Sequence, residues 1–119
     1  MSYDIGLYQK AFLKNAIEND LGDWTKADPI DSTVRDSIKD MLLSDGYIVD
    51  SESGVSTDLV HPKKEWGLQV CIFKGQISFS IPYWDDADNP VEETKRYAWK
   101  IAKKFNLGYH DRQEGTTEY

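Results

Sequence analysis

The chain has 119 residues, of which 39% are hydrophobic and 13% aromatic, and these values indicate one folded domain and not a disordered chain. Its formal net charge of −7 argues against nucleic acid as a direct ligand, because phosphate binding depends largely on Lys and Arg, and it favours a basic partner. A single cysteine excludes an internal disulfide. The sequence has no secretory signal pattern and no apolar run near the roughly 20 residues of a membrane helix. We therefore expect a cytoplasmic protein without membrane contact.

The start of the chain predicts a strand followed by a helix. Ser2 to Tyr8 alternates like a strand, with Tyr3, Ile5 and Leu7 on one side. Tyr8 to Asn19 then changes to helical spacing. The predicted inward stripe of this helix is Phe12, Leu13, Ala16, Ile17 and Leu21.

A second helix and two short strands follow. Asp31 or Ser32 is the expected N-cap of a helix that runs to about Ser44, before Gly46. Its predicted inward residues are Val34, Ile38, Met41 and Leu42. The next predicted elements are a strand from Tyr47 to Val49, a turn from Asp50 to Gly54, and a strand from Val55 to His61.

The stretch Trp66 to Tyr83 predicts the central β-hairpin of the fold. A two-residue turn at Lys74-Gly75 is expected, with the glycine supplying the positive φ that tight hairpins need. This register pairs Ile72 with Ile77, Val70 with Phe79 and Leu68 with Ile81 on one apolar face. The other face is mixed and consists of Gln69, Cys71, Phe73, Gln76, Ser78 and Ser80.

The last helix has the clearest start signal. Asn89 is its expected N-cap, Pro90 its first residue, and Glu92 lies three residues after the cap. Its predicted inward residues are Val91, Thr94, Ala98, Ile101, Ala102 and Phe105. A short strand from Tyr109 to Arg112 and a polar tail from Gln113 to Tyr119 follow.

Together these elements predict a single α+β domain over residues 1–119, with the polar C-terminal tail beginning at about residue 113. The fold expected is a largely antiparallel sheet built on the central hairpin, Trp66 to Tyr83, with three amphipathic helices packed on one face.

The sequence contains no catalytic or cofactor motif, and we expect a protein that is not an enzyme and holds no cofactor or metal. Cys71 is expected to be structural, because the register places it mid-strand, away from both histidines. His61 and His110 lack metal-ligand spacing and are expected in loops. A calcium loop beginning at Asp85 would place Pro90 where the EF-hand pattern requires Gly.

Aromatic residues interleaved with acids in the predicted loops are the candidate partner-binding residues. They are Asp23, Trp24, Asp28, Tyr83, Trp84, Asp85, Asp86 and Asp88. Trp and Tyr are common interface anchors, and an acidic rim would attract a basic partner. The alternative is that both tryptophans only cover the edges of the core.

The segments YDIGLYQKAFLKNAI, LGDWTKADPI and SDGYIV resemble small bacterial proteins of unassigned function. The chain as a whole is short, acidic and rich in aromatic residues, and it resembles the immunity proteins of bacterial polymorphic-toxin and contact-dependent inhibition systems. This resemblance implies a partner, a cognate toxin that is often a basic nuclease, whose active site an acidic surface would cover. Immunity proteins have many unrelated folds, so the resemblance assigns no functional residues.

Three hypotheses stay open at this point. The first is a non-catalytic protein-binding module, an immunity protein that neutralises a toxin. The second is a small accessory or housekeeping domain with a ligand pocket, including an enzyme, which a cleft with His61, His110 or Cys71 beside carboxylates would favour. The third is a structural or regulatory dimer that pairs through an edge strand or the mixed hairpin face.

Overall fold

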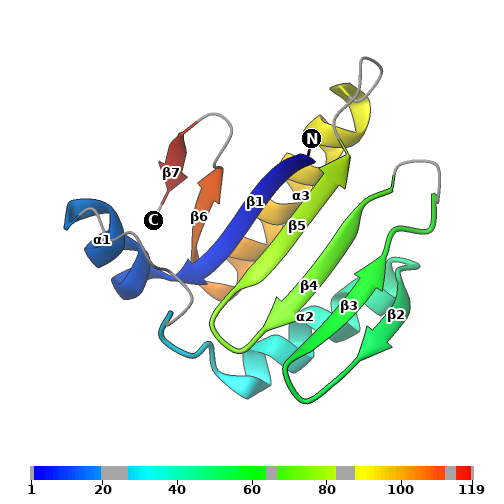
Figure 1. Cartoon of the computed structure of the whole chain (residues 1–119), viewed down its shortest axis with the longest axis horizontal. Coiled ribbons are helices and arrows are strands. Elements are labelled where there is room, and N and C mark those ends of the chain that lie inside the picture. The colour runs from blue at the N-terminus through cyan, green and yellow to red at the C-terminus, as the bar shows by residue number, and fades with distance from the viewer. Residues whose placement is uncertain (1, 20–26, 64–66, 83–87, 112–114, 119) are drawn as a thin grey trace.

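The computed structural model describes residues 2–19, 27–63, 67–82, 88–111 and 115–118. These residues form one antiparallel sheet of seven strands, in the order β2-β3-β4-β5-β1-β6-β7, with three helices packed against it (Figure 1). The strands are β1 (Ser2–Gln9), β2 (Ile48–Glu52), β3 (Ser56–Val60), β4 (Gln69–Phe73), β5 (Ile77–Pro82), β6 (Leu107–Asp111) and β7 (Thr116–Glu118). The helices are α1 (Lys10–Glu18), α2 (Ser32–Ser44) and α3 (Asp88–Phe105). The predicted α+β class is confirmed.

The central hairpin has the register that the sequence predicts. Val70 pairs with Phe79 and Ile72 pairs with Ile77 across β4 and β5. Val70 and Phe79 have no exposed surface, so this face of the hairpin forms a wall of the core. The first strand, β1, completes the centre of the sheet, because it pairs with β5 on one side and with β6 on the other.

The reason expected for a glycine in the hairpin turn is wrong. Neither Lys74 nor Gly75 has a positive φ. A Cβ atom on Gly75 would instead lie 2.7 Å from the carbonyl oxygen of Ala27. Ile30 N also donates a 2.8 Å hydrogen bond to Lys74 O. The turn therefore needs glycine because the segment leading to α2 passes directly against it.

The helices α2 and α3 supply the main core together with one face of the sheet. Asp31 caps α2 as predicted, since its Oδ1 accepts a 2.8 Å hydrogen bond from Thr33 N. The buried residues of α2 and α3 are Ile38, Leu42, Val91, Thr94, Ala98, Ile101 and Ala102. Val34, Met41 and Phe105 pack against this core while partly exposed, so both predicted stripes are confirmed. None of the described helices is long and apolar enough to cross a membrane.

The first helix, α1, does not share the face that α2 and α3 cover. Its buried residues Phe12, Leu13 and Ala16 form a separate cluster with Tyr8. Side chains alternate along a strand, so the Tyr8 side chain lies on the opposite side of the sheet from that of Leu7. Gly108 is paired with Tyr8 and is therefore at a position that faces the same side as Tyr8. Only two helices therefore pack on the predicted face. Ile17 of α1, predicted to be inward, is 41% exposed because this short helix covers only the end of β1 and β6.

Several element boundaries differ from the predictions, and three of the differences change an element's extent or existence. The expected turn at Asp50 to Gly54 begins later than predicted: Asp50 to Glu52 belong to β2, where an irregularity between Val49 and Ser51 lets the strand continue, and only Ser53 and Gly54 lie in the turn. The predicted polar tail contains the edge strand β7, which pairs with β6. The last helix begins at Asp88, one residue before the expected N-cap Asn89.

Candidate functional site

The residues predicted to bind a partner fall mostly outside the described part of the chain. Those outside it are Asp23, Trp24, Tyr83, Trp84, Asp85 and Asp86. Asp28 is exposed in the segment that passes the Lys74–Gly75 turn, where β5 begins. Asp88 begins α3 beyond the other end of β5 (Figure 1). These two residues therefore lie at opposite ends of the sheet, and the predicted partner surface stays a prediction.

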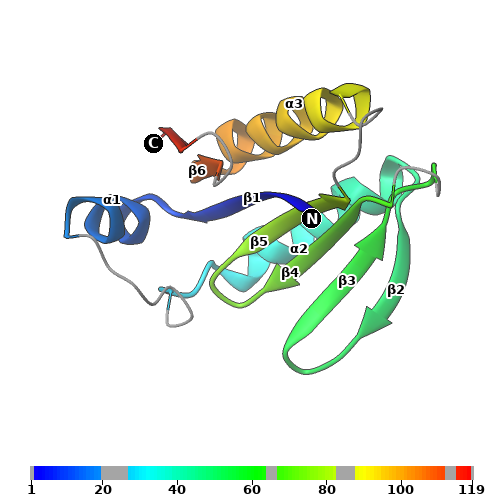
Figure 2. The same ribbon diagram turned by 45° about the horizontal axis from the view of Figure 1, so that its top comes forward.

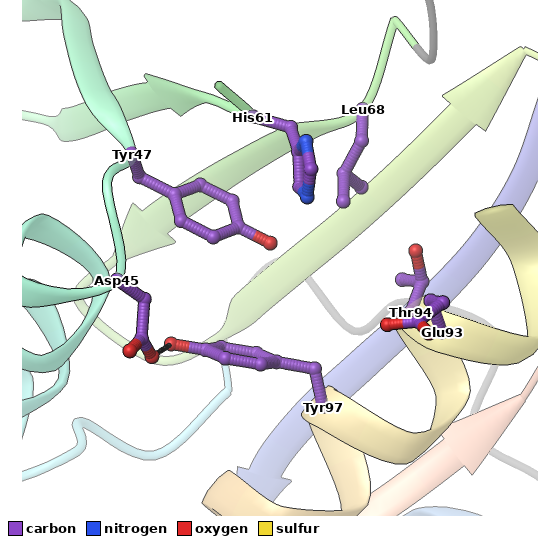
Figure 3. A pocket seen from close by; sticks show the side chains of 7 residues that line it. All are labelled: Asp45, Tyr47, His61, Leu68, Glu93, Thr94 and Tyr97. Atoms are coloured by element: carbon purple, nitrogen blue, oxygen red, sulfur yellow. Dashed lines mark hydrogen bonds between the residues drawn. The ribbon is translucent and has the colours of Figure 1, made fainter. Parts of the chain in front are cut away.

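A small pocket lies where the end of α2, the start of β4 and the first turns of α3 meet (Figure 3). Its lining residues are Asp45, Tyr47, His61, Leu68, Glu93, Thr94 and Tyr97. Its volume is about 110 Å³. Tyr47, Leu68 and Thr94 are buried and form its walls. Asp45 and Glu93 are exposed, so two carboxylates border the solvent side.

The turn after α2 places Asp45 and Tyr47 beside each other. Gly46 has a φ of +95°, a backbone conformation in which glycine carries no steric penalty. Gly46 N donates to Leu43 O at 3.1 Å, and Tyr47 N donates to Leu42 O at 3.0 Å. These two bonds define a Schellman motif, which ends the helix and turns the Tyr47 side chain back onto the core.

The link between β3 and β4 orients His61. The His61 backbone N donates to Leu68 O at 3.0 Å, which holds the two ends of this link together. The Lys63 backbone N donates to His61 Nδ1 at 2.9 Å. Since Nδ1 accepts this bond, the neutral imidazole carries its hydrogen on Nε2.

Three aromatic rings meet in the pocket. The Tyr97 hydroxyl of α3 donates a hydrogen bond to Asp45 Oδ2 at the end of α2 (Figure 3). The Tyr47 ring lies 5.1 Å from the His61 ring, edge to face, and 5.8 Å from the Tyr97 ring, measured between centroids. The pocket therefore joins three separate segments through one hydrogen bond and two ring contacts.

The electrostatic environment of the pocket is negative. Burial is the main cause of a pKa of Tyr47 well above the usual tyrosine value, and the nearby charges of Asp45 and Glu93 raise that pKa further. Burial and the hydrogen bond to Asp45 likewise raise the pKa of Tyr97. Both phenols keep their protons near neutral pH, so the pocket presents hydroxyls, ring faces and carboxylates.

A shallow groove adjoins the pocket and leads to the β2–β3 hairpin. It has a volume of about 390 Å³ and shares His61 and Leu68 with the pocket. Its remaining lining residues are Ile48, Val49, Asp50, Val60, Gly67 and Gln69. Every residue of β2 is exposed, and Val55 at the hairpin tip is 75% exposed. Residues 45–60 contain four carboxylates and no Lys or Arg, and Lys39 of α2 pairs with one of them, Glu52, at 3.0 Å. Carboxylates still outnumber basic groups here, so this edge of the sheet is acidic as well as apolar.

Cys71 lies on the mixed hairpin face, paired with Ser78 as predicted. Burial raises the pKa of its thiol to about 11, and a hydrogen bond to Asp58 adds to the rise. A thiol with this pKa is almost entirely protonated at neutral pH, and the protonated form is a poor nucleophile. Ser78 and Ser80 are half-buried and Gln69 is exposed, so this part of the face is open to solvent.

The two histidines occupy different regions of the sheet. His110 lies in β6, where its Nδ1 shares a 2.9 Å hydrogen bond with Thr117 Oγ1. Three strands, β1, β5 and β4, separate β6 from β3, the strand that precedes His61. Among the described residues, no group of three or more His, Cys, Asp or Glu side chains is arranged to hold a metal ion.

Of the pocket residues, only His61 was singled out from the sequence for its chemistry. Gly46 indicated where α2 ends, and the turn it makes places Asp45 and Tyr47 in the pocket. Tyr97 lies three residues after Thr94 and therefore flanks the inward stripe of α3. Their meeting with His61 depends on how α3 lies across the sheet, which no local pattern encodes.

No protein-family model, curated protein or solved structure matches this chain.

Proposed function

We propose that this protein is a non-catalytic protein-binding module of the bacterial cytoplasm, an immunity protein that neutralises a cognate toxin by covering a basic surface. The observation that carries the proposal is the acidic and apolar β2–β3 hairpin at the edge of the sheet (Figure 2). The net charge of −7 also supports the proposal, because it attracts a basic partner over a distance.

The exposed apolar side chains of the hairpin would form the centre of the interface. Ile48 is 50% exposed and Val49 is 37% exposed, and both line the groove beside the pocket. Burial of apolar surface contributes about 25 cal/mol per Å², so these side chains favour docking. The carboxylates of Asp50 and Glu52 lie on the same strand and would form a charged rim, in which Glu52 also pairs with Lys39 of α2 at 3.0 Å.

The position of β2 supports a specific mode of docking. It is the outermost strand in the sheet order, and no described strand pairs with its outer edge. An exposed edge presents backbone donors and acceptors to which a partner strand can pair. The partner would add a strand to β2, while its basic side chains meet the carboxylates.

The test is co-purification of the tagged protein with the product of the adjacent upstream gene, followed by calorimetry. We expect nanomolar affinity and rescue of cells that express the toxin. The double variant Asp50→Lys/Glu52→Lys should weaken binding at least about tenfold and slow association, because it places like charges opposite each other.

The matched control is Glu18→Lys/Glu118→Lys, which makes the same charge change on α1 and β7, away from the hairpin. Its affinity should stay within about threefold of the unmodified protein. The proposal is contradicted if the neighbouring product is not a toxin and nothing binds at nanomolar concentration. Equal losses in both double variants would show a net-charge effect and contradict the hairpin as the docking surface.

A small-ligand function is the second candidate, because His61 lines the same pocket as the two carboxylates Asp45 and Glu93. The pocket alone, at about 110 Å³, lies below the 300–1,000 Å³ typical of sites for small molecules, whereas the adjoining groove of about 390 Å³ lies at the lower end of that range. An enzyme would turn over a substrate and lose that activity in His61→Gln. A binding module would keep nanomolar affinity for its partner without any turnover.

A further inference from the structure

We propose that the pocket lined by Asp45, Tyr47, Glu93 and Tyr97 receives a Lys or Arg side chain of a protein partner. This inference rests on the proposed function for the identity of the partner. Its chemistry rests on the pocket alone, which combines aromatic rings with carboxylates and lies beside the acidic hairpin.

The rings and carboxylates suit a positively charged group. A cation over the face of a tyrosine is attracted by the negative face of the ring, and the attraction grows as the group leaves water. The Tyr47 and Tyr97 rings lie 5.8 Å apart at an angle of 34° and border the same cavity. A carboxylate has about four acceptor sites, and the Tyr97 hydroxyl uses one of those of Asp45.

The electrostatic field in the pocket supports this selectivity. Asp45 is the C-cap of α2 and Glu93 lies on α3, and the charges of both act on the buried phenol of Tyr47. A positive charge placed between them would be stabilised by both. The basic groups that α3 carries nearby are Lys95 and Arg96, which pair with Glu92 and Glu93 at 3.6 and 3.8 Å. Arg96 is therefore a competitor for Glu93, and Asp45 is the carboxylate on which the selectivity mainly depends.

The size of the pocket suits a side chain better than a separate ligand. Water occupies about 30 Å³ per molecule in the liquid, so 110 Å³ corresponds to three or four waters. This space accepts an ammonium or guanidinium head with a short stretch of its stem. The adjoining groove of about 390 Å³ would accommodate the backbone that presents the side chain.

The first experiment needs no partner. N-acetyl-lysine methylamide is titrated into ¹⁵N- and ¹³C-labelled protein and followed by NMR, with N-acetyl-norleucine methylamide as the neutral probe of similar shape. We expect millimolar binding of the lysine probe, with shifts at Tyr47, His61, Thr94 and Tyr97, and binding at least about tenfold weaker for norleucine. Similar affinities for the two probes would overturn the inference, because they would show a merely apolar pocket.

Two variants test whether Asp45 is responsible for binding the lysine probe. Asp45→Asn keeps an acceptor for Tyr97 but removes the charge, and it should weaken lysine binding about tenfold or more. Asp40→Asn makes the same change on an exposed residue of α2 outside the pocket and should leave the affinity unchanged. If Asp45→Asn binds the lysine probe as tightly as the unmodified protein, the inference is wrong.

Two further outcomes distinguish this inference from a site for a small free amine and from the proposed function. If n-butylammonium binds and the capped lysine does not, the pocket serves a small free amine and the inference is overturned. If a partner binds at nanomolar concentration and Asp45→Asn binds it equally well, the proposed function stands and the pocket inference fails. Failure to find any partner contradicts the proposed function but leaves the probe selectivity as a separate result.

Discussion

The Tyr3 hydroxyl donates a 2.5 Å hydrogen bond to Asp111 Oδ2, and the two residues are 108 positions apart in the chain. Asp111 is 1% exposed and Tyr3 is 5% exposed, so this hydrogen bond joins β1 to β6 inside the core. Lys95 of α3 lies 5.3 Å from the centroid of the Tyr3 ring. A carboxylate, a phenol and an ammonium group from three elements therefore meet at one site.

Replacing Tyr3 by Phe should lower the free energy of unfolding by about 1.5–3 kcal/mol, because it removes a hydrogen bond to a charged, buried acceptor. Urea denaturation measures the change. A double-mutant cycle with Asp111→Ala should give a coupling energy above about 0.5 kcal/mol, and additive single effects would contradict a direct interaction between the two groups.

Replacing Phe79 by Asp should unfold the protein at room temperature. Phe79 has no exposed surface, and an unpaired buried charge costs several kcal/mol, a large part of the 5–15 kcal/mol stability of a typical domain. Gln69→Asp is the control, since this residue is exposed one position before Val70 on the paired strand. Circular dichroism should show a folded control and an unfolded Phe79→Asp variant; a folded variant would disprove the assignment of this face to the core.

Substitutions of Gly75 distinguish the two reasons for a glycine in the hairpin turn. A Cβ atom there would lie 2.7 Å from Ala27 O, so Ala and Asn should both destabilise the protein, by about 1–3 kcal/mol. Asn tolerates a positive φ better than Ala does, so it would be clearly the milder change only if the turn required a positive φ. Thermal denaturation of the two variants decides between a steric and a conformational requirement.

The reactivity of Cys71 should depend steeply on pH. Its pKa is raised to about 11, so its rate of alkylation by iodoacetamide should increase about tenfold per pH unit from pH 7 to 10 without reaching a plateau. Asp58→Asn should shift this profile to lower pH, whereas Asp50→Asn should not. A midpoint near pH 8.5 in the unmodified protein would contradict the burial of the thiol.

The same group affects alkaline stability. The folded-state pKa exceeds the ordinary value of 9.0, so the folded chain keeps the proton more tightly than the unfolded chain. The stabilisation is therefore complete below about pH 9 and is lost as the pH rises toward 11. Cys71→Ser should have a flatter stability profile across this interval in urea denaturation.

Local patterns predicted the elements of this fold well, and long-range contacts produced the differences. The pairing of Val70 with Phe79 follows from alternation around a short turn, and the start of α2 follows from the cap of Asp31. The face that α1 covers could not be predicted in this way. It depends on Tyr8 and Gly108, which are 100 positions apart and meet only in the assembled sheet.

The candidate site was less accessible to sequence analysis than the fold. The hydrogen bond from Tyr97 to Asp45 spans 52 positions, and neither residue belongs to a motif. The edge strand β7 was missed because three polar residues in a short segment carry no strand signal unless a partner strand is known. The net charge of −7 favours a basic partner, which stays a prediction, and it does not identify which edge of the sheet would bind such a partner.

The central position of β1 in the sheet affects how the chain folds during its synthesis. Strand β1 is enclosed by β5 and β6, which follow it in the chain and end at residues 82 and 111. During synthesis the middle of the sheet therefore cannot be completed until residue 111 has been added, and the apolar side of β1 stays uncovered until then. Chaperones that bind emerging apolar segments should accordingly recognise this strand.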